Sequence, residues 1–199
     1  KGAWSIEDTT ALFKKAIELG CPFRVHVDQF NALGMLEKAI ELGAKSVDHL
    51  EHSTDEGIKT LAHSDTIGVL LPVSGFCLND AYARGRFIVD SGCAVAIATN
   101  FNPGSAQSPS MPFAISLACR RLGLTPAEAI TAATYNAACV LGIENQVGSL
   151  EVGKKANLQL LEFDDERQLA WEVATGGPLL VSIDGEVIHL LTDGGHLEE

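Results

Sequence analysis

Apolar residues along this chain alternate between a spacing typical of helices and one typical of strands. A capping sequence at Ser5–Asp8 opens the first helical stretch, and Gly20 ends it. Its predicted apolar face consists of Leu12, Phe13, Ala16 and Ile17. The run Phe23–Asp28 then predicts a strand, and a second helix follows that ends at Gly43. The apolar face of this second helix is predicted to hold Leu33, Leu36, Ala39 and Ile40.

The same alternation predicts further strand–helix units. The additional strands are expected at Ser46–Glu51, Ile67–Val73 and Cys93–Asn100. The additional helices are expected after the cap Ser53–Glu56, across Tyr82–Asp90, and after Thr125-Pro126-Ala127-Glu128. The hexapeptide Lys15–Gly20 recurs as Lys38–Gly43, which fits repeated units. Strand starts near residues 23, 46, 67 and 93 predict either an α/β barrel or a doubly wound sheet.

The pattern changes at Gly148. Short antiparallel strands are predicted at Ala156–Phe163, Leu179–Ile183 and Val187–Leu191. Asp184-Gly185 is a strong hairpin signal between the last two. Because a full (β/α)₈ barrel needs about 250 residues, the preceding strands correspond to half of a barrel. We therefore expect residues 1–147 to form this half and residues 148–199 to form a different domain.

Composition narrows the class of protein. The formal charge of −12 makes binding to a phosphate backbone improbable. No apolar run is long enough to span a bilayer, and no signal peptide opens the chain. The cysteines are odd in number, widely spaced and without a C-x-x-C pair, which is typical of buried reduced thiols. We expect a cytoplasmic protein that binds neither nucleic acid nor membranes.

Polar side chains end several predicted strands, and the carboxyl ends of parallel barrel strands carry the functional groups. His26 and His49 end adjacent strands, where an imidazole either completes the core through a hydrogen bond or serves as a metal ligand or proton carrier. Asp28 is predicted either to orient a substrate or to cap the helix that follows. Both alternatives remain open for each residue.

The segment Ala98–Ser105 is the sharpest local signal. An apolar strand ends at Asn100, and the turn Asn102-Pro103-Gly104 follows. Exposed backbone N–H groups in such a loop suit a carboxylate or amide ligand. Alternatively, Asn-Pro-Gly is simply favourable turn chemistry.

Together, these segments resemble imidazolonepropionases over about residues 1–190. The stretches that carry the resemblance are His26–Phe30 with Leu33-Gly34, Ser46–Glu51, Val69–Pro72, Ala98–Ser105, Leu124–Ala129 and Gly148–Lys154. The S-x-D-H-L-E and F-N-P-G-S pieces are the most specific to that family, whereas the last stretch is common to many amidohydrolases.

The resemblance implies a (β/α)₈ TIM-barrel amidohydrolase, here its C-terminal half, with part of a small β-sandwich. It implies hydrolysis of the cyclic amide bond of 4-imidazolone-5-propanoate to N-formimidoyl-L-glutamate in histidine degradation. It also implies one Zn²⁺ or Fe²⁺ ion, a small-molecule substrate, and a homodimer for the full-length protein.

Family roles transfer to individual positions. His26 matches a metal ligand, Gln29 a substrate contact, and His49 the histidine that polarises the attacked carbonyl. The loop that holds substrate and product is matched by Asn102, Gly104 and Ser105. The other histidines match nothing functional and are expected on the solvated surface: His52, His63, His189 and His196.

Two departures from the family pattern concern catalysis. Asn100 stands where the family has a metal-ligating Asp that shuttles a proton, and a neutral amide cannot act as a general base. The H-x-H metal pair and the arginine-bearing substrate segment of the family are absent from this sequence. The alternatives are therefore a non-catalytic fragment or pseudoenzyme, and an amidohydrolase that acts on another cyclic amide or amidine.

Overall fold

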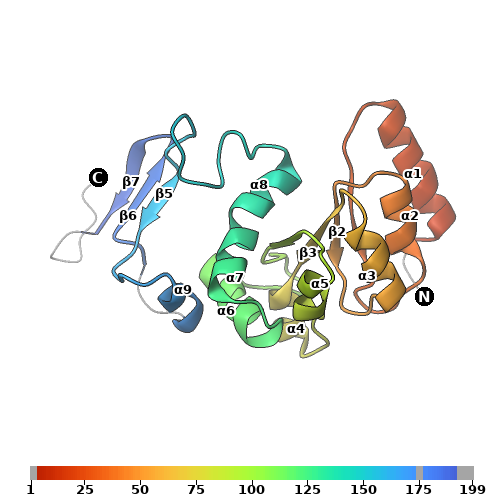
Figure 1. The fold of residues 1–199 in the computed structure, drawn as a ribbon, viewed down its shortest axis with the longest axis horizontal. Coiled ribbons are helices and arrows are strands. Elements are labelled where there is room, and N and C mark those ends of the chain that lie inside the picture. Colours follow the sequence, from red (N-terminus) through yellow and green to blue (C-terminus); the bar gives the residue numbers. More distant parts are fainter. Residues whose placement is uncertain (1–3, 174–176, 192–199) are drawn as a thin grey trace.

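The computed structural model describes residues 4–173 and 177–191. Its larger sheet has four parallel strands in the order β1-β2-β3-β4. They are β1 (Arg24–Val27), β2 (Ser46–His49), β3 (Ile67–Leu70) and β4 (Val95–Ile97). Helices connect consecutive strands, so the predicted α/β class is confirmed (Figure 1). Because all neighbouring strands run parallel, the carboxyl ends of all four lie along one edge of the sheet.

The described helices follow the predicted rhythm. They are α1 (Ile6–Glu18), α2 (Met35–Glu41), α3 (Asp55–Ala62), α4 (Pro72–Leu78), α5 (Gly85–Asp90), α6 (Met111–Arg121), α7 (Pro126–Ala133), α8 (Tyr135–Leu141) and α9 (Arg167–Trp171). The caps predicted for α1, α3 and α7 are confirmed, because a side-chain oxygen accepts a first-turn backbone N–H in each. These oxygens belong to Ser5, Thr54 and Thr125.

Several predicted boundaries were wrong: β4 and β5 are shorter than the expected Cys93–Asn100 and Ala156–Phe163, and three further boundaries differ. The second helix begins at Met35, so Leu33 lies in a loop and is exposed. The third strand ends at Leu70 and not at Val73, because Pro72 begins α4, where its fixed φ suits the first turn. The helix expected across Tyr82–Asp90 begins only at Gly85.

Alternate residues of the parallel strands point into the main core. Val47, Leu70 and Ile97 are almost fully buried on the face that the helices cover. Leu36 of α2 and Ile58 of α3 pack in the same cluster. The apolar positions of successive strands thus form one layer beneath the helices, as a parallel sheet requires.

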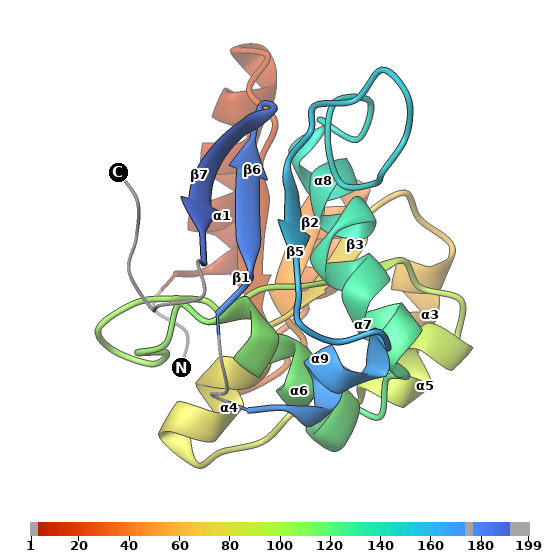
Figure 2. The same ribbon diagram turned by 90° about the vertical axis from the view of Figure 1, so that its left-hand side faces the viewer.

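The C-terminal region forms a separate three-stranded sheet, as Figure 2 shows. Its antiparallel strands are β5 (Leu158–Leu160), β6 (Leu180–Ile183) and β7 (Glu186–Leu190). The predicted hairpin is confirmed: Asp184 and Gly185 have φ of 53° and 87°, as a type I′ turn needs. Helices α7 and α8 lie between the two sheets (Figure 1).

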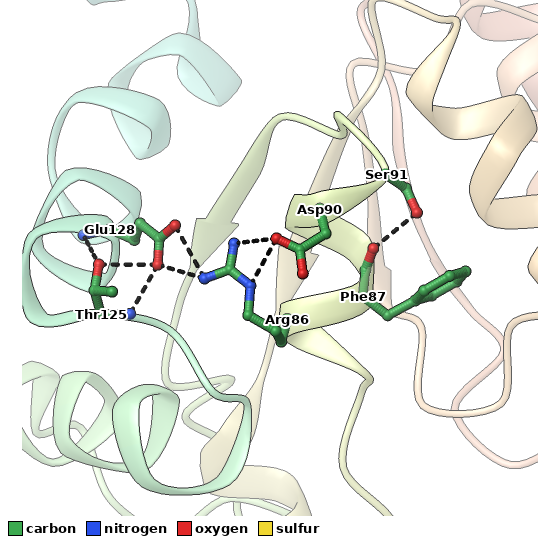
Figure 3. A network of polar contacts seen from close by, with 6 residues as sticks. All are labelled: Arg86, Phe87, Asp90, Ser91, Thr125 and Glu128. Atoms are coloured by element: carbon green, nitrogen blue, oxygen red, sulfur yellow. Dashed lines mark hydrogen bonds and ion pairs between the residues drawn. The ribbon is translucent and has the colours of Figure 1, made fainter.

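A polar network joins α5 to α7 (Figure 3). Arg86 Nη1 donates to Glu128 Oε2 at 2.9 Å, and Arg86 Nε donates to Asp90 at 2.9 Å. Glu128 Oε2 also accepts from the backbone N and the hydroxyl of Thr125, which completes the predicted capping box. The bond from Arg86, together with those from Thr125, lowers the pKa of Glu128 to about 2.

The five cysteines are all unpaired, as predicted, but the expected burial is met fully only at Cys93, and Cys119 and Cys139 are only partly buried. Cys93 is buried, whereas Cys21 and Cys77 are exposed. Within residues 4–173 and 177–191, no helix is long and apolar enough to cross a membrane.

Candidate functional site

The parallel register brings the two strand-end histidines together. Val27 of β1 pairs with His49 of β2, and His26 pairs with Asp48. The rings of His26 and His49 lie edge to face with centroids 5.0 Å apart. Asn100 follows β4 at the same edge of the sheet. The structure therefore brings together side chains from strands that are far apart in the sequence.

The backbone at this edge leaves the strands in an unusual conformation. Asp28, His49, Leu50 and Asn100 have φ of 53°, 88°, 71° and 54°, in the left-handed region that side-chain-bearing residues rarely adopt. Each such residue costs about 1–3 kcal/mol. Strained backbone conformations cluster at functional sites. Here they occur at or just after the ends of β1, β2 and β4.

His26 lies beside a partly buried carboxylate. Its side chain is 63% exposed, and its Nδ1 lies 3.5 Å from Asp48 Oδ2. Ser46 Oγ donates to Asp48 Oδ1 at 2.9 Å. Burial raises the pKa of Asp48, while the Ser46 bond and the two neighbouring histidines oppose the rise. With Asp48 on the Nδ1 side, the other ring nitrogen of His26 is the one left for a ligand.

His49 is buried and has its own carboxylate. Its side chain is only 2% exposed, and Nδ1 lies 3.1 Å from Glu51 Oε1. An ionised carboxylate only accepts hydrogen bonds, so Nδ1 is the donor in this pair. The ring is thus held by one specific contact.

Asp28 ties the two strand ends to each other. Ser53 Oγ donates to Asp28 Oδ2 at 2.8 Å, and both side chains are buried. Burial raises the pKa of Asp28, and the Ser53 bond opposes the rise. The alternative that Asp28 caps the next helix is wrong, because α2 begins at Met35 with Gly34 at its N-cap.

The loop after β4 is held by its own amides. Asn100 Nδ2 donates to the buried Ser74 Oγ at 2.8 Å. Asn102 Oδ1 accepts from the backbone N of Gly104 and of Ser105, each at 2.8 Å. These two N–H groups are therefore occupied within the loop, which favours turn chemistry over an open anion-accepting concavity.

A cleft of about 390 Å³ opens on the sheet face opposite the main core. His26 and Asn100 line it, together with Arg24, Ser46 and Asp48, which the sequence interpretation did not single out. Their signal was present, because Arg24/His26 and Ser46/Asp48 are polar pairs at two-residue spacing in short strands. The remaining lining residues are Val69, Leu71, Ala96, Ile97, Ala98, Ala137, Val140 and Leu141.

Several predicted site residues do not line this cleft. They are Gln29, His49, Asn102, Gly104 and Ser105. A larger cleft of about 450 Å³ lies between α6, α7 and α9, and its lining contains neither imidazole nor carboxylate. The smaller cleft is therefore the candidate site.

The side chains present do not by themselves make a metal site. Among the residues that the structure describes, no group of three or more His, Cys, Asp or Glu could hold a metal ion. His26 offers one imidazole nitrogen, and Asn100 offers at most its amide oxygen, since its Nδ2 donates to Ser74. A catalytic zinc normally has three protein ligands, so this set falls short.

The other histidines in the described part of the chain do not line the cleft. His52 and His63 are exposed, as predicted. His189 is half-buried, and its ring lies 3.1 Å from the carbonyl oxygen of Pro178. His196 lies outside the described residues.

Comparison with known sequences confirms the resemblance. Residues 2–188 match the Amidohydrolase family. An imidazolonepropionase from Phocaeicola vulgatus is 43% identical over 95% of this chain and 46% of its own length. One from Symbiobacterium thermophilum is 43% identical over 88% of this chain and 41% of its own length. The chain thus spans about half the length of the curated relatives it matches.

Solved structures share the fold at low identity. An adenosine deaminase from Xanthomonas campestris with bound zinc superposes with a TM-score of 0.75, at 18% identity over 92% of this chain and 48% of that one. A mutant of the atrazine chlorohydrolase from Arthrobacter aurescens TC1, complexed with zinc and atraton, gives a TM-score of 0.73 at 19% identity, over 93% and 48%. These likenesses concern the fold alone.

Proposed function

We propose that this chain, which belongs to the amidohydrolase family, forms part of an imidazolonepropionase. The observation that carries the proposal is the 43% identity to a curated imidazolonepropionase over nearly the whole chain. The reaction is hydrolysis of the cyclic amide bond of 4-imidazolone-5-propanoate, which gives N-formimidoyl-L-glutamate.

In this proposal the four-stranded sheet is the C-terminal half of a (β/α)₈ barrel. Residues 1–147 make up this half, and residues 148–199 belong to a small β-sandwich. The open face with the 390 Å³ cleft supports the assignment, since the interior of a complete barrel is closed by further strands. The full-length protein is proposed to be a cytoplasmic homodimer with a small-molecule substrate.

The chemistry requires water to add to the ring carbonyl and the ring C–N bond to break. His49 is proposed to polarise the carbonyl oxygen through Nε2–H, which stabilises the negative charge that develops there. Because Nδ1–H donates to Glu51, this role requires the ring to carry a proton on both nitrogens. Gln29 is proposed to contact the substrate. The loop residues proposed to hold substrate and product are Asn102, Gly104 and Ser105. To bind a ligand, the backbone N–H groups of Gly104 and Ser105 would have to release Asn102 Oδ1 and donate to the ligand instead.

His26 is proposed as a metal ligand that acts with ligands beyond the described residues. When bound, a Zn²⁺ or Fe²⁺ ion lowers the pKa of a coordinated water. Two of the structural neighbours hold zinc, which supports a metal in general but does not choose between these ions.

Asn100 is the weak point of the proposed reaction. An amide cannot take the proton from water and return it to the leaving nitrogen, whereas a carboxylate at this position can do both. Asn100 Nδ2 donates a hydrogen bond to Ser74 Oγ. A carboxylate at this position could not donate, so the Ser74 hydroxyl would have to donate to it instead. Because Asn100 is bonded in this way and cannot act as a base, a non-catalytic role for the chain is the competing proposal.

One experiment separates these proposals. The first half of the Phocaeicola vulgatus relative is joined to this chain, and loss of imidazolonepropionate and metal content are measured. Asn100→Asp should raise turnover by about 10²–10⁴-fold, the usual contribution of a positioned acid–base group. His49→Ala should lower turnover with little loss of metal, and His26→Ala should lower both.

The outcomes are distinct. If Asn100→Asp and the parent hydrolyse equally fast, position 100 is not the proton shuttle. If neither hydrolyses imidazolonepropionate although metal is retained, the substrate assignment is wrong and other cyclic amides become the substrates to test.

A further inference from the structure

The family-specific motif Ser46–Glu51 contains two carboxylates to which the proposed reaction assigns no role. The structure places each beside a different imidazole: Asp48 lies beside His26, and Glu51 lies beside His49. Of the two contacts, the one between Glu51 and His49 is shorter, at 3.1 Å against 3.5 Å, and both of its side chains are buried.

The contact between Glu51 and His49 depends on the bent end of β2. Residues two apart on a regular strand have Cα atoms about 6.5 Å apart and parallel side chains. Here His49 and Leu50 both have left-handed backbone conformations, which turn the chain back on itself. The N–H of Leu50 donates to the carbonyl of Val27 and thereby fixes the turn against β1. The strained turn brings the Glu51 carboxylate onto Nδ1 of the His49 ring.

Glu51 is not paired as a structural carboxylate would be. Its side chain is 6% exposed, and Oε2 has no hydrogen-bond partner among the described residues. A buried carboxylate oxygen without a partner is costly, and native structures keep few such groups. Within the described part of the chain, this carboxylate makes its hydrogen bond to His49 alone.

We infer that Glu51 is the positioning residue for His49. The inference rests on the proposed function, in which His49 meets the substrate carbonyl. A hydrogen bond at one ring nitrogen sets what the other can do. With Nδ1 held by Glu51, the ring cannot turn over, and Nε2 is the only nitrogen that can face a substrate. Glu51 touches no substrate itself and acts through the imidazole.

The test uses two replacements of similar volume in the joined full-length protein described above. Glu51→Met removes the acceptor for Nδ1, whereas Glu51→Gln keeps a neutral one. Glu51→Met should lower kcat by about 10–100-fold, the effect usual for a residue that orients a functional imidazole, with KM changed less than about twofold. Glu51→Gln should retain more of the activity, and Glu56→Gln, at an exposed glutamate of α3, should match the parent.

The second readout does not depend on activity. In protein labelled with ¹⁵N-histidine, the parent should show a slowly exchanging proton on Nδ1 of His49 that disappears in Glu51→Met. Absence of that proton in the parent overturns the inference, even if a variant fails to fold. Equal kcat values for the Met and Gln variants also overturn it, because a space-filling role would tolerate both.

Failure of the proposed function gives a different result. In that case the joined protein does not hydrolyse imidazolonepropionate, while the Nδ1 proton still reports whether Glu51 holds the ring.

Discussion

Two regions of this chain shift the pKa values of their carboxylates in opposite directions. In the network between α5 and α7, Glu128 accepts from Arg86 and Thr125, and its pKa falls to about 2 (Figure 3). At the carboxyl edge of the parallel sheet, Asp28 is buried and Asp48 is partly buried, and burial raises the pKa of each. Folding therefore favours the charged form in the first region and opposes it in the second.

The difference follows from what surrounds each group. Glu128 is partly exposed and faces a guanidinium, so its charge is both hydrated and paired. Asp28 has one hydroxyl donor, and Glu51 has one imidazole and an oxygen without a partner among the described residues. Buried carboxylates with few hydrogen-bond donors destabilise the fold. Where they gather at the edge of a sheet at which several strands end, they are typical of functional sites. The first region stabilises the fold, and the second is where chemistry is expected.

The largest effect on stability is expected from Ser53→Ala. This change removes the hydroxyl that donates to buried Asp28 and leaves a carboxylate oxygen without a partner. The free energy of unfolding should fall by about 2 kcal/mol. Urea unfolding followed by circular dichroism measures the change.

Ser91→Ala is the matched control for that experiment. The hydroxyl of Ser91 donates at 2.8 Å to the neutral carbonyl of Phe87 and not to a charge (Figure 3). Its loss should lower the free energy of unfolding by only about 0.5–1 kcal/mol. Equal losses for the two serines would mean that Asp28 is not held as a buried charge.

A smaller effect is expected in the α5–α7 network. Glu128→Gln keeps the shape of the side chain but removes the charge facing Arg86. Because the Glu128 side chain is 34% exposed, solvent screens the pair, and the loss should be about 1 kcal/mol or less. The same change at exposed Glu162 should have no measurable effect. A Glu128 variant as stable as the parent would show that the network only orders the helices.

The contribution of Glu128 should also depend on pH in a defined window. Its pKa lies near 2 in the folded chain and near the ordinary 4.5 in the unfolded chain. The stabilisation is therefore complete above about pH 4.5 and is lost as the pH falls towards 2. The difference in urea midpoint between parent and Glu128→Gln should shrink over this range. A constant difference from pH 6 to pH 2 would contradict the assigned pKa.

The sequence predicted the parts of both regions that depend on short-range rules. The capping box of Thr125 and Glu128 was predicted because its two bonds span one helical turn. The placement of His26 and His49 near the same ends of neighbouring strands was predicted because parallel strands align their carboxyl ends. The partner of Glu128 was not predicted, since Arg86 is far away in the sequence and only packing brings it near.

The same limit applies to the candidate site. Asp28 was predicted to cap a helix or orient a substrate, but its actual partner is Ser53 on the next strand–helix connection. Glu51 stood in the motif without a role, because two residues on a regular strand do not touch. Only the left-handed turn at His49 and Leu50, which no residue type in the motif requires, brings its carboxylate to the ring.

The smallest effect is expected from Asp28→Asn, and its sign sharpens the comparison. Since burial raises the pKa of Asp28, its contribution to the free energy of unfolding declines as pH rises above the ordinary value of 3.8, opposite to that of Glu128. At neutral pH the amide removes a buried charge but adds two N–H groups that need acceptors, so the net change should be about 0.5 kcal/mol or less. The decisive measurement is the double variant with Ser53→Ala. If the cost of Ser53→Ala comes from an unpaired charge, it should drop to that of Ser91→Ala once Asp28 is an amide. A cost that stays the same in both backgrounds would instead assign the Ser53 effect to packing, and the contrast between the two regions would no longer rest on charge.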